Sequence, residues 1–277
     1  TSVTGVQTCA LPILSDVAGH IQVLADDAFE GREGGHRGGR AASSYIEQEI
    51  RPLGLIPAGT NKSYFQSFPT RFGTLRNVLV MIPGSDPVLQ SEVIVVGAHY
   101  DHVGYGNKRN SFGPFGYVHN GADDNASGVA GLIKIVETLA RLPDPCRRTI
   151  LFAFWDGEEQ GLLGSKYFIK NRPDCMQGKN IVFSINLDMI GRLRHRQLSV
   201  FGGRSAVGLE TLVTHANNRH ENKSLELIFN WKITPDSDHY PFLKAEVPTL
   251  MFHTGLHPDY HRDRKSTRLN SSHRCIS

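Results

Sequence analysis

Residues 149–160 read TILFAFWDGEEQ, and this stretch decides how the rest of the chain is interpreted. The uncharged run TILFAFW predicts a short strand that is buried on both faces. Strands of this kind occur in sheets that helices cover on both sides. An aspartate and two adjacent glutamates follow directly, which fits either an exposed acidic turn or a functional site. The stretch therefore predicts an α/β protein with acidic side chains at one edge of its sheet.

The same alternation of strands and helices continues on both sides of this stretch. Residues 126–142, for example, carry apolar side chains at helical spacing until Pro143 ends the pattern. We expect helices over residues 16–25, 40–50, 126–142, 161–170 and 206–219, and strands over residues 77–82, 92–98, 149–155, 181–187, 198–201, 225–229 and 248–252. This order predicts an α/β sandwich with a mostly parallel sheet.

Side chains that bind metals follow three of the predicted strands. His99 comes after VIVVGA, Glu159 after the LFAFW strand, and Asp188 after IVFSINL. Ligands of open α/β sheets bind at the carboxyl ends of the strands, so these side chains are expected to meet at one edge. Zinc binds imidazole nitrogen and carboxylate oxygen. These three side chains, Asp123 and one histidine near the end of the chain are the expected ligands of two zinc ions.

The segment GAHYDH places His99 and Asp101 two residues apart, so in an extended chain both point to the same side. A histidine that binds zinc usually donates its other N–H to a carboxylate, and Asp101 is the candidate for that role. His102 would point the other way, and we expect it to be a solvated turn residue.

The segment GADDNASG opens the helix predicted over residues 126–142. Asp124 or Asn125 could cap that helix. Capping accounts for one of the three residues Asp123, Asp124 and Asn125, but not for the other two. We expect Asp123, which precedes the cap, to bridge two cations with its two oxygens.

The two adjacent glutamates are expected to have different roles in hydrolysis. Glu159 is expected to bind metal, while Glu158 stays off the metal and accepts a proton from the attacking water. The last ligand must come from FHTGLHPDYH, which contains His253, His257 and His261. Sequence spacing alone does not choose among these three histidines.

Six segments together resemble the two-zinc aminopeptidase family that includes aminopeptidase Y and glutamate carboxypeptidase. They occur in the family's order and are GAHYDH, GADDNASG, DGEEQGLLGS, INLDMIGR, SDHYPF and FHTGLHPDYH. The resemblance covers residues 14–262. It implies a zinc-peptidase-like three-layer α/β/α sandwich with a mostly parallel, mixed central sheet.

By position, the resemblance implies a role for each metal ligand. His99 and Asp188 would hold one Zn²⁺, and Glu159 and His261 would hold the other. Asp123 would bridge the two ions, and the peptide bond between residues 123 and 124 would be cis.

The resemblance also implies catalytic roles. Glu158 matches the general base, Asp101 the carboxylate behind the first histidine, and Tyr260 a tyrosine that in some relatives binds the oxyanion. Asp238 and His239 belong to a family motif near the substrate pocket, but no chemical role follows for them.

The chain has 277 residues, of which 39% are hydrophobic, and a formal net charge of +3. Four of its basic residues lie in the last fourteen positions, so the remainder is close to neutral and gives no argument for nucleic acid. The two ends, residues 1–13 and 264–277, resemble translated sequencing adapters and are expected to be non-native. We expect residues 14–263 to form one zinc peptidase domain without the C-terminal segment of its relatives.

These observations predict an exopeptidase that acts on peptide substrates, with an aminopeptidase favoured. A carboxypeptidase or dipeptidase of the same fold is the alternative, followed by a glutaminyl cyclase-like acyltransferase with one zinc or a non-catalytic binding module. No apolar run is long enough to span a membrane, and the resemblance implies a secreted or periplasmic protein. Cys146 and Cys175 are a possible disulfide, which two cysteines do not establish.

Overall fold

The computed structural model describes residues 10–219, 224–232 and 234–262. The helices are α1 (Ala10–Leu24), α2 (Arg37–Ile50), α3 (Gly128–Ala140), α4 (Leu163–Lys170), α5 (Leu209–Asn218) and α6 (His239–Lys244). The strands are β1 (Ile56–Pro57), β2 (Phe65–Thr70), β3 (Gly73–Ile82), β4 (Glu92–His99), β5 (Thr149–Trp155), β6 (Asn180–Leu187), β7 (Gln197–Phe201), β8 (Glu226–Asn230) and β9 (Thr249–His253).

The described strands form one mixed sheet. Its order is β1-β3-β5-β4-β6-β9-β7-β8, and β2 also pairs with β3. The central strands β5, β4, β6 and β9 are parallel, whereas β3 and β7 run antiparallel to their inner neighbours. Because β5, β4 and β6 are adjacent and parallel, their carboxyl ends lie side by side. The predicted mixed α/β fold is therefore confirmed.

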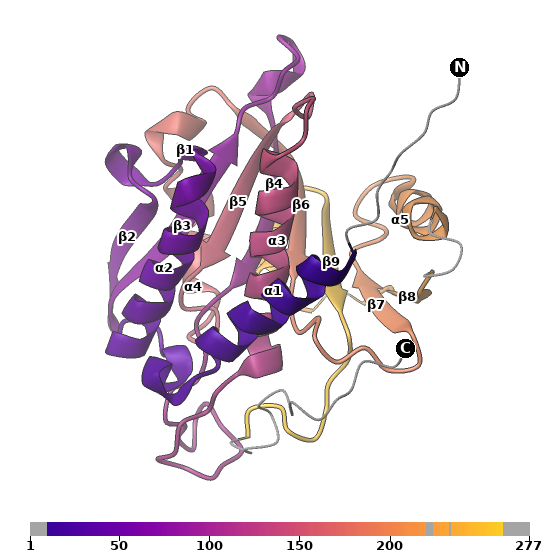
Figure 1. The fold of residues 1–277 in the computed structure, drawn as a ribbon. Helices are drawn as coiled ribbons and strands as arrows, with labels where there is room; N and C mark the ends of the chain where they lie inside the picture. Colours follow the sequence, from indigo (N-terminus) through magenta and orange to yellow (C-terminus); the bar gives the residue numbers. More distant parts are fainter. Residues whose placement is uncertain (1–9, 220–223, 233, 263–277) are drawn as a thin grey trace.

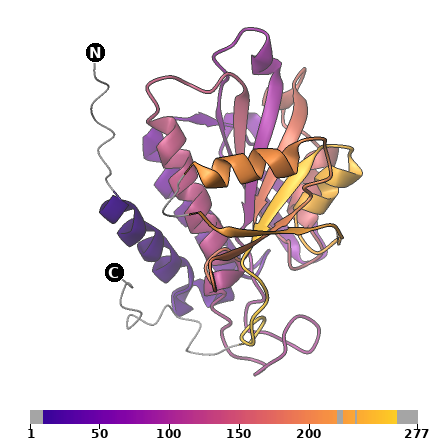
Figure 2. The same ribbon diagram turned by 90° about the vertical axis from the view of Figure 1, so that its right-hand side faces the viewer.

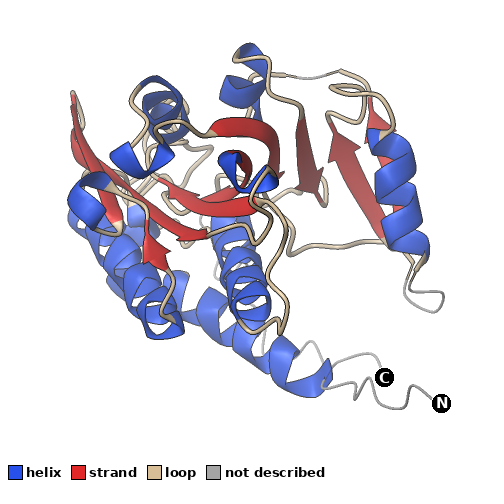
Figure 3. Ribbon diagram, turned by 90° about the horizontal axis from the view of Figure 1, so that it is seen from above, coloured by secondary structure: helices blue, strands red, loops and turns tan. Residues whose placement is uncertain are grey.

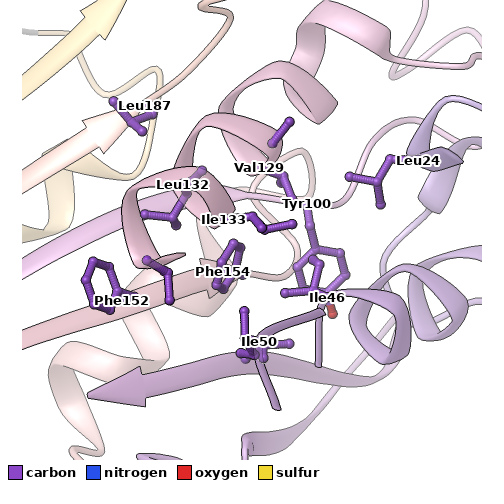
Figure 4. Close-up of a cluster of buried hydrophobic side chains, with 14 of the residues drawn as sticks. Leu24, Ile46, Ile50, Tyr100, Val129, Leu132, Ile133, Phe152, Phe154 and Leu187 are labelled. Carbon is purple, nitrogen blue, oxygen red and sulfur yellow. The ribbon is translucent and has the colours of Figure 1, made fainter. Parts of the chain in front are cut away.

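Helices cover both faces of the sheet (Figures 1 and 3). On one face, α1, α2 and α3 pack on a cluster of apolar residues that includes Ile46, Leu132, Phe152 and Phe154 (Figure 4). On the other face, Phe168 of α4 and Phe242 of α6 pack around Trp155. Phe152 and Phe154 point to one face and Leu151, Ala153 and Trp155 to the other, as the period of two in a strand requires. The uncharged composition of β5 follows from burial on both faces.

The strands β7 and β8 form the far edge of the sheet, with α5 beside them (Figure 2). Val200, Leu209 and Leu250 form a smaller apolar cluster there, joined by Leu227 and Phe229. This edge carries residues that line the cavity described below.

Several predicted boundaries were wrong. Helix α1 begins at Ala10 rather than at residue 16, and α3 begins later than predicted because residues 122–127 form a wider, π-helical turn. The elements β1, β2 and α6 were not predicted from the sequence. These elements are short, and β2 contains Pro69, which weakens a strand pattern.

Cys146 and Cys175 do not pair; each is a free cysteine. They lie on opposite faces of the sheet, since Cys146 packs against the cluster under α1–α3 and Cys175 against the cluster around Trp155. Among the described residues, no helix is both long and apolar enough to cross a membrane.

Candidate metal centre

Two groups of side chains that could hold a metal ion, all buried or half-buried, meet at the carboxyl ends of β4, β5 and β6. The first group is His99, Glu158 and Asp188, and the second is His102, Asp124, Glu159 and His261. Within each group, one ligand atom from every member lies within 4.8 Å of the others. The side chains that were predicted at strand ends therefore do lie together: His99, Glu158, Glu159 and Asp188. Loops and turns supply the other members of the two groups.

Asp124 joins the two groups. Its Oδ1 lies 3.5 Å from His99 Nε2, and its Oδ2 lies 3.0 Å from His261 Nε2. One carboxylate thus faces a histidine of each group, which is the arrangement that a bridging ligand needs. His99 Nε2 also lies 3.4 Å from Asp188 Oδ1, and His261 Nε2 lies 3.1 Å from Glu159 Oε1.

This geometry differs from the prediction, which placed Asp123 between the two ions. Asp123 turns away from both groups: its Oδ1 accepts the N–H of Gly191 at 2.8 Å and the hydroxyl of Ser127 at 3.2 Å. The reason is the backbone between residues 122 and 127, where Asp124 and Asn125 leave helical φ/ψ values. The cis peptide bond joins Asp124 to Asn125, so its prediction between residues 123 and 124 was wrong by one position.

Asp101 has a wider structural role than the one predicted. Its two carboxylate oxygens accept the backbone N–H groups of Glu158 at 3.0 Å and of Glu159 at 3.2 Å. The Nδ1 atom of His99 is 3.8 Å from Asp101 Oδ1 and 3.2 Å from the backbone oxygen of Asp101. Asp101 therefore lies beside His99, but its carboxylate does not form the expected hydrogen bond to that ring; it holds the turn that presents both glutamates.

His102 is not the solvated turn residue that we predicted, because only 4% of its surface is exposed. Its Nδ1 lies 2.8 Å from Glu159 Oε1. The chain does not continue straight after β4: the N–H of His102 donates to the backbone oxygen of Arg32, and this turn directs the ring inward.

Of the three C-terminal histidines, only His261 enters a ligand group. His257 contacts Asp123, and His253 Nδ1 accepts the N–H of Gly255. The ring of Tyr260 stacks on His261 with centroids 4.0 Å apart. Burial raises the pKa of Tyr260, and the carboxylates of Asp124 and Glu159 raise it further, so the phenol keeps its proton.

No role for Arg32 was predicted from the sequence. Its guanidinium is fully buried and donates hydrogen bonds to the backbone oxygens of Leu24, Tyr100, Asn120, Gly121 and Asp124. Burial lowers the pKa of Arg32 to about 10, so it remains charged at neutral pH. It ties the segment after β4 to the turn that carries Asp124. A single arginine in a glycine-rich segment has no periodic pattern that would have revealed this role.

The two adjacent glutamates have opposite electrostatic environments. Burial raises the pKa of Glu158 well above its usual value, and the carboxylates of Glu159 and Asp238 add to this. Burial acts in the same direction on Glu159, but its contacts with His102 and His261 lower the pKa of that carboxyl. Pairs of acidic residues whose pKa values are shifted in opposite directions are typical of sites where one of the two acts as a general acid or base.

A cavity of about 310 Å³ opens beside both groups. Its polar wall includes His99, Glu158 and Tyr260, and its apolar wall includes Met189, Phe201 and Leu256. Glu158 is therefore accessible from a partly apolar cavity.

The donors in this centre fit zinc. They are imidazole nitrogens and carboxylate oxygens, and the nearest donor atoms of different residues are 2.8–3.7 Å apart. Ligands at the corners of a tetrahedron around zinc, bonded at about 2.0–2.1 Å, lie roughly 3.3 Å apart. A cation also offsets the repulsion between carboxylates that are buried this close together.

Residues 77–272 match the family described as "Peptidase family M28". The chain belongs to peptidase family M28. This match covers all the predicted site residues and confirms the family that the sequence motifs indicated.

Two curated relatives are similar to the chain over part of its length. It is 29% identical over 181 residues to leupeptin-inactivating enzyme 1 of Streptomyces exfoliatus, covering 64% of this chain and 36% of that protein. It is 29% identical over 162 residues to leucine aminopeptidase 1 of Trichophyton rubrum, covering 56% and 40%. The chain thus spans less than half the length of these relatives.

Solved structures share the fold at low identity. BSAP, a zinc aminopeptidase from Bacillus subtilis, superposes with a TM-score of 0.66 at 16% identity, over 90% of this chain and 88% of that one. Glutaminyl cyclase of Porphyromonas gingivalis superposes with a TM-score of 0.71 at 20% identity, over 90% and 88%. Both similarities describe the fold alone.

Proposed function

We propose that this chain is a zinc-dependent exopeptidase, and specifically an aminopeptidase that removes N-terminal residues from peptides with two Zn²⁺. The observation that carries the proposal is the position of Asp124, whose two oxygens face His99 in one ligand group and His261 in the other. Membership of family M28 and the similarity to a leucine aminopeptidase support the same activity.

In this proposal His99 and Asp188 hold the first ion, Glu159 and His261 hold the second, and Asp124 bridges them in the role expected for Asp123. When bound, the two zinc ions supply Lewis acidity that polarises the scissile carbonyl and lowers the pKa of water. The remaining chemistry belongs to the side chains around them.

Glu158 is the proposed general base. It lines the cavity, and it accepts a proton from the attacking water and returns it to the amine that leaves. Asp101 holds the backbone of Glu158 and Glu159 in place through its two accepted hydrogen bonds. Tyr260, which also lines the cavity, keeps its proton and donates a hydrogen bond from its phenol to the oxygen of the substrate carbonyl as negative charge develops there.

The test is the zinc content of the purified chain together with a panel of aminoacyl-nitroanilides, with and without a chelator. We expect about two zinc ions per chain and release of nitroaniline that the chelator abolishes. Two ions without release from any free-amine substrate would exclude the aminopeptidase and direct the search to carboxypeptidase and dipeptidase substrates.

A glutaminyl cyclase-like acyltransferase is the second candidate, favoured by the TM-score of 0.71 to the cyclase of Porphyromonas gingivalis. It requires a single zinc ion, so the zinc content separates it from the two-ion peptidase. A secreted or periplasmic location stays a prediction from the family resemblance.

A further inference from the structure

The second ligand group contains one more histidine than the bridged two-ion scheme uses. His102 is nine-tenths or more buried and points its Nδ1 atom at the carboxylates of that group. The distances are 2.8 Å to Glu159 Oε1 and 3.7 Å to Asp124 Oδ2. Its ring meets that of His261 edge-on, with centroids 5.4 Å apart and planes at 87°.

The packing around His102 leaves its ring little freedom. Its backbone N–H donates to the carbonyl of Arg32 at 3.3 Å, which sets the turn after β4. On the other side lies Gly121: a Cβ atom at that position would stand 2.6 Å from His102 Cδ2. The absence of a side chain at Gly121 is therefore what lets the imidazole lie against the ligand group.

Four of the six distances between the donor atoms of the second group are close to those of a tetrahedral site. His261 Nε2 lies 3.0 Å from Asp124 Oδ2 and 3.1 Å from Glu159 Oε1. With the two His102 distances, these values bracket the roughly 3.3 Å expected between ligands of tetrahedral zinc. His102, Asp124, Glu159 and His261 thus form a four-donor set that a single ion can fill.

The first group is different. It provides three donors, which are His99, Asp188 and the other oxygen of Asp124. Glu158 does not count as a ligand here, because it is the proposed general base. Zinc sites with four protein ligands are typically structural, whereas catalytic sites have three and keep one position open.

We propose that His102 is a fourth protein ligand of the second zinc ion, bound through Nδ1. This ion is then held by a closed set of protein ligands, and the open position of the centre lies at the first ion, beside Glu158. The inference rests on the two-zinc function proposed above and adds an asymmetry between the ions: the second would be bound more tightly than the first.

The competing role for His102 is that of a hydrogen-bond donor that orients Glu159 without touching the ion. Two substitutions separate the roles. His102→Gln keeps an N–H donor of similar reach but is a poor zinc ligand, whereas His102→Cys provides a thiolate ligand but no comparable donor. His20→Gln, at a buried histidine that contacts Tyr45 instead, is the matched control.

The experiment measures zinc binding to each protein by competition with a chromogenic chelator, with circular dichroism as the check on folding. For the wild type we expect two ions of unequal affinity. His102→Gln should weaken the tighter ion at least 100-fold, His102→Cys should restore most of that loss, and His20→Gln should match the wild type. A crystal structure of the zinc-loaded wild type should place Nδ1 about 2.0–2.1 Å from the second ion.

Each other outcome is informative. Full affinity in His102→Gln with a loss in His102→Cys, or a ring nitrogen more than 3 Å from the ion, overturns the ligand role but leaves the two-zinc peptidase intact. A wild type that binds no zinc overturns both the inference and the proposed function. If His102→Gln fails to fold, the crystal structure of the wild type still decides.

Discussion

His257 Nε2 lies 3.2 Å from Asp123 Oδ2, and both side chains are almost completely buried. The pair is in contact but not aligned as a hydrogen bond, since neither atom has a hydrogen-bond partner among the described residues. It joins the loop that carries His261 to the turn that carries Asp124. Two proposed ligands from distant parts of the chain, Asp124 and His261, are thus linked by residues that do not themselves belong to either ligand group.

Adjacent aspartates should therefore respond differently to substitution. Asp124→Ala removes the carboxylate shared by both groups, and we expect loss of at least one zinc ion and of activity. Asp123→Ala should retain two ions, yet lower the free energy of unfolding by about 1–3 kcal/mol, because it leaves the Gly191 N–H without its acceptor. Zinc content and urea denaturation measure the two effects. If Asp123→Ala lost zinc while Asp124→Ala kept it, the assignment of the bridge would be reversed.

Glu158→Gln tests the general base. The amide has nearly the same shape and cannot accept a proton, so kcat should fall by about 10²–10⁴-fold. Zinc content and thermal midpoint should remain near those of the wild type, because Asp101 binds the backbone of this residue and not its carboxylate. Steady-state kinetics on the best nitroanilide substrate measure the change. An unchanged kcat would remove Glu158 from the mechanism.

Tyr260→Phe tests the donor to the oxyanion. Loss of one such donor lowers kcat by about 10²–10³-fold where it has been measured in other enzymes. The phenylalanine ring can still stack on His261, so zinc affinity should change little. Equal losses of zinc affinity and kcat would instead indicate that Tyr260 acts by holding His261 in place.

Arg32→Met tests the buried guanidinium. The substitution leaves buried carbonyl oxygens without a donor, so we expect the free energy of unfolding to fall by about 3 kcal/mol or more. Zinc affinity should fall with it, because Arg32 binds the backbone next to Asp124. Arg40→Met, at an exposed arginine of α2, is the control and should stay within about 0.5 kcal/mol of the wild type. Denaturant titration measures both variants, and equal stability of the two would contradict the assigned role.

His20 predicts a pH dependence of stability. Burial lowers the pKa of this histidine below its ordinary value of 6.5 in the folded chain. Above pH 6.5 both states hold it neutral, so its contribution is fully present. As the pH falls below 6.5, the unfolded chain takes up the proton first, and stability is lost until the lower folded pKa is reached.

The check compares wild type with His20→Gln in urea at pH 7.5, 6.5 and 5.5, with zinc in excess. Both proteins lose stability through weaker metal binding at low pH, but only the wild type carries the histidine. The difference in unfolding free energy should therefore shift in favour of the variant as the pH falls. A constant difference would show that His20 titrates alike in both states.

Much of the centre was predictable because strand ends are visible in a sequence. Four side chains follow apolar runs that form adjacent parallel strands: His99, Glu158, Glu159 and Asp188. Because the carboxyl ends of such strands lie side by side, these residues had to lie near one another. Tyr260 and His261 came from the family resemblance, since three histidines share one loop. The mistakes fell where the backbone leaves regular geometry. Nothing in GADDNASG distinguishes Asp123 from Asp124 until the π-helical turn directs one inward and the other toward His257.

Local sequence patterns were enough to predict the layered α/β architecture, the edge of the sheet where the site lies, and the kinds of donor that meet there. Hydrophobic periodicity and the chemistry of side chains at strand ends are local properties, so they can be read along the chain. The three-dimensional arrangement was needed to show which aspartate faces both histidines, that His102 is buried against Glu159, and that Arg32 binds backbone carbonyls beside the site. Those relationships join segments far apart in the chain, and they depend on turns whose direction is set by packing rather than by local sequence.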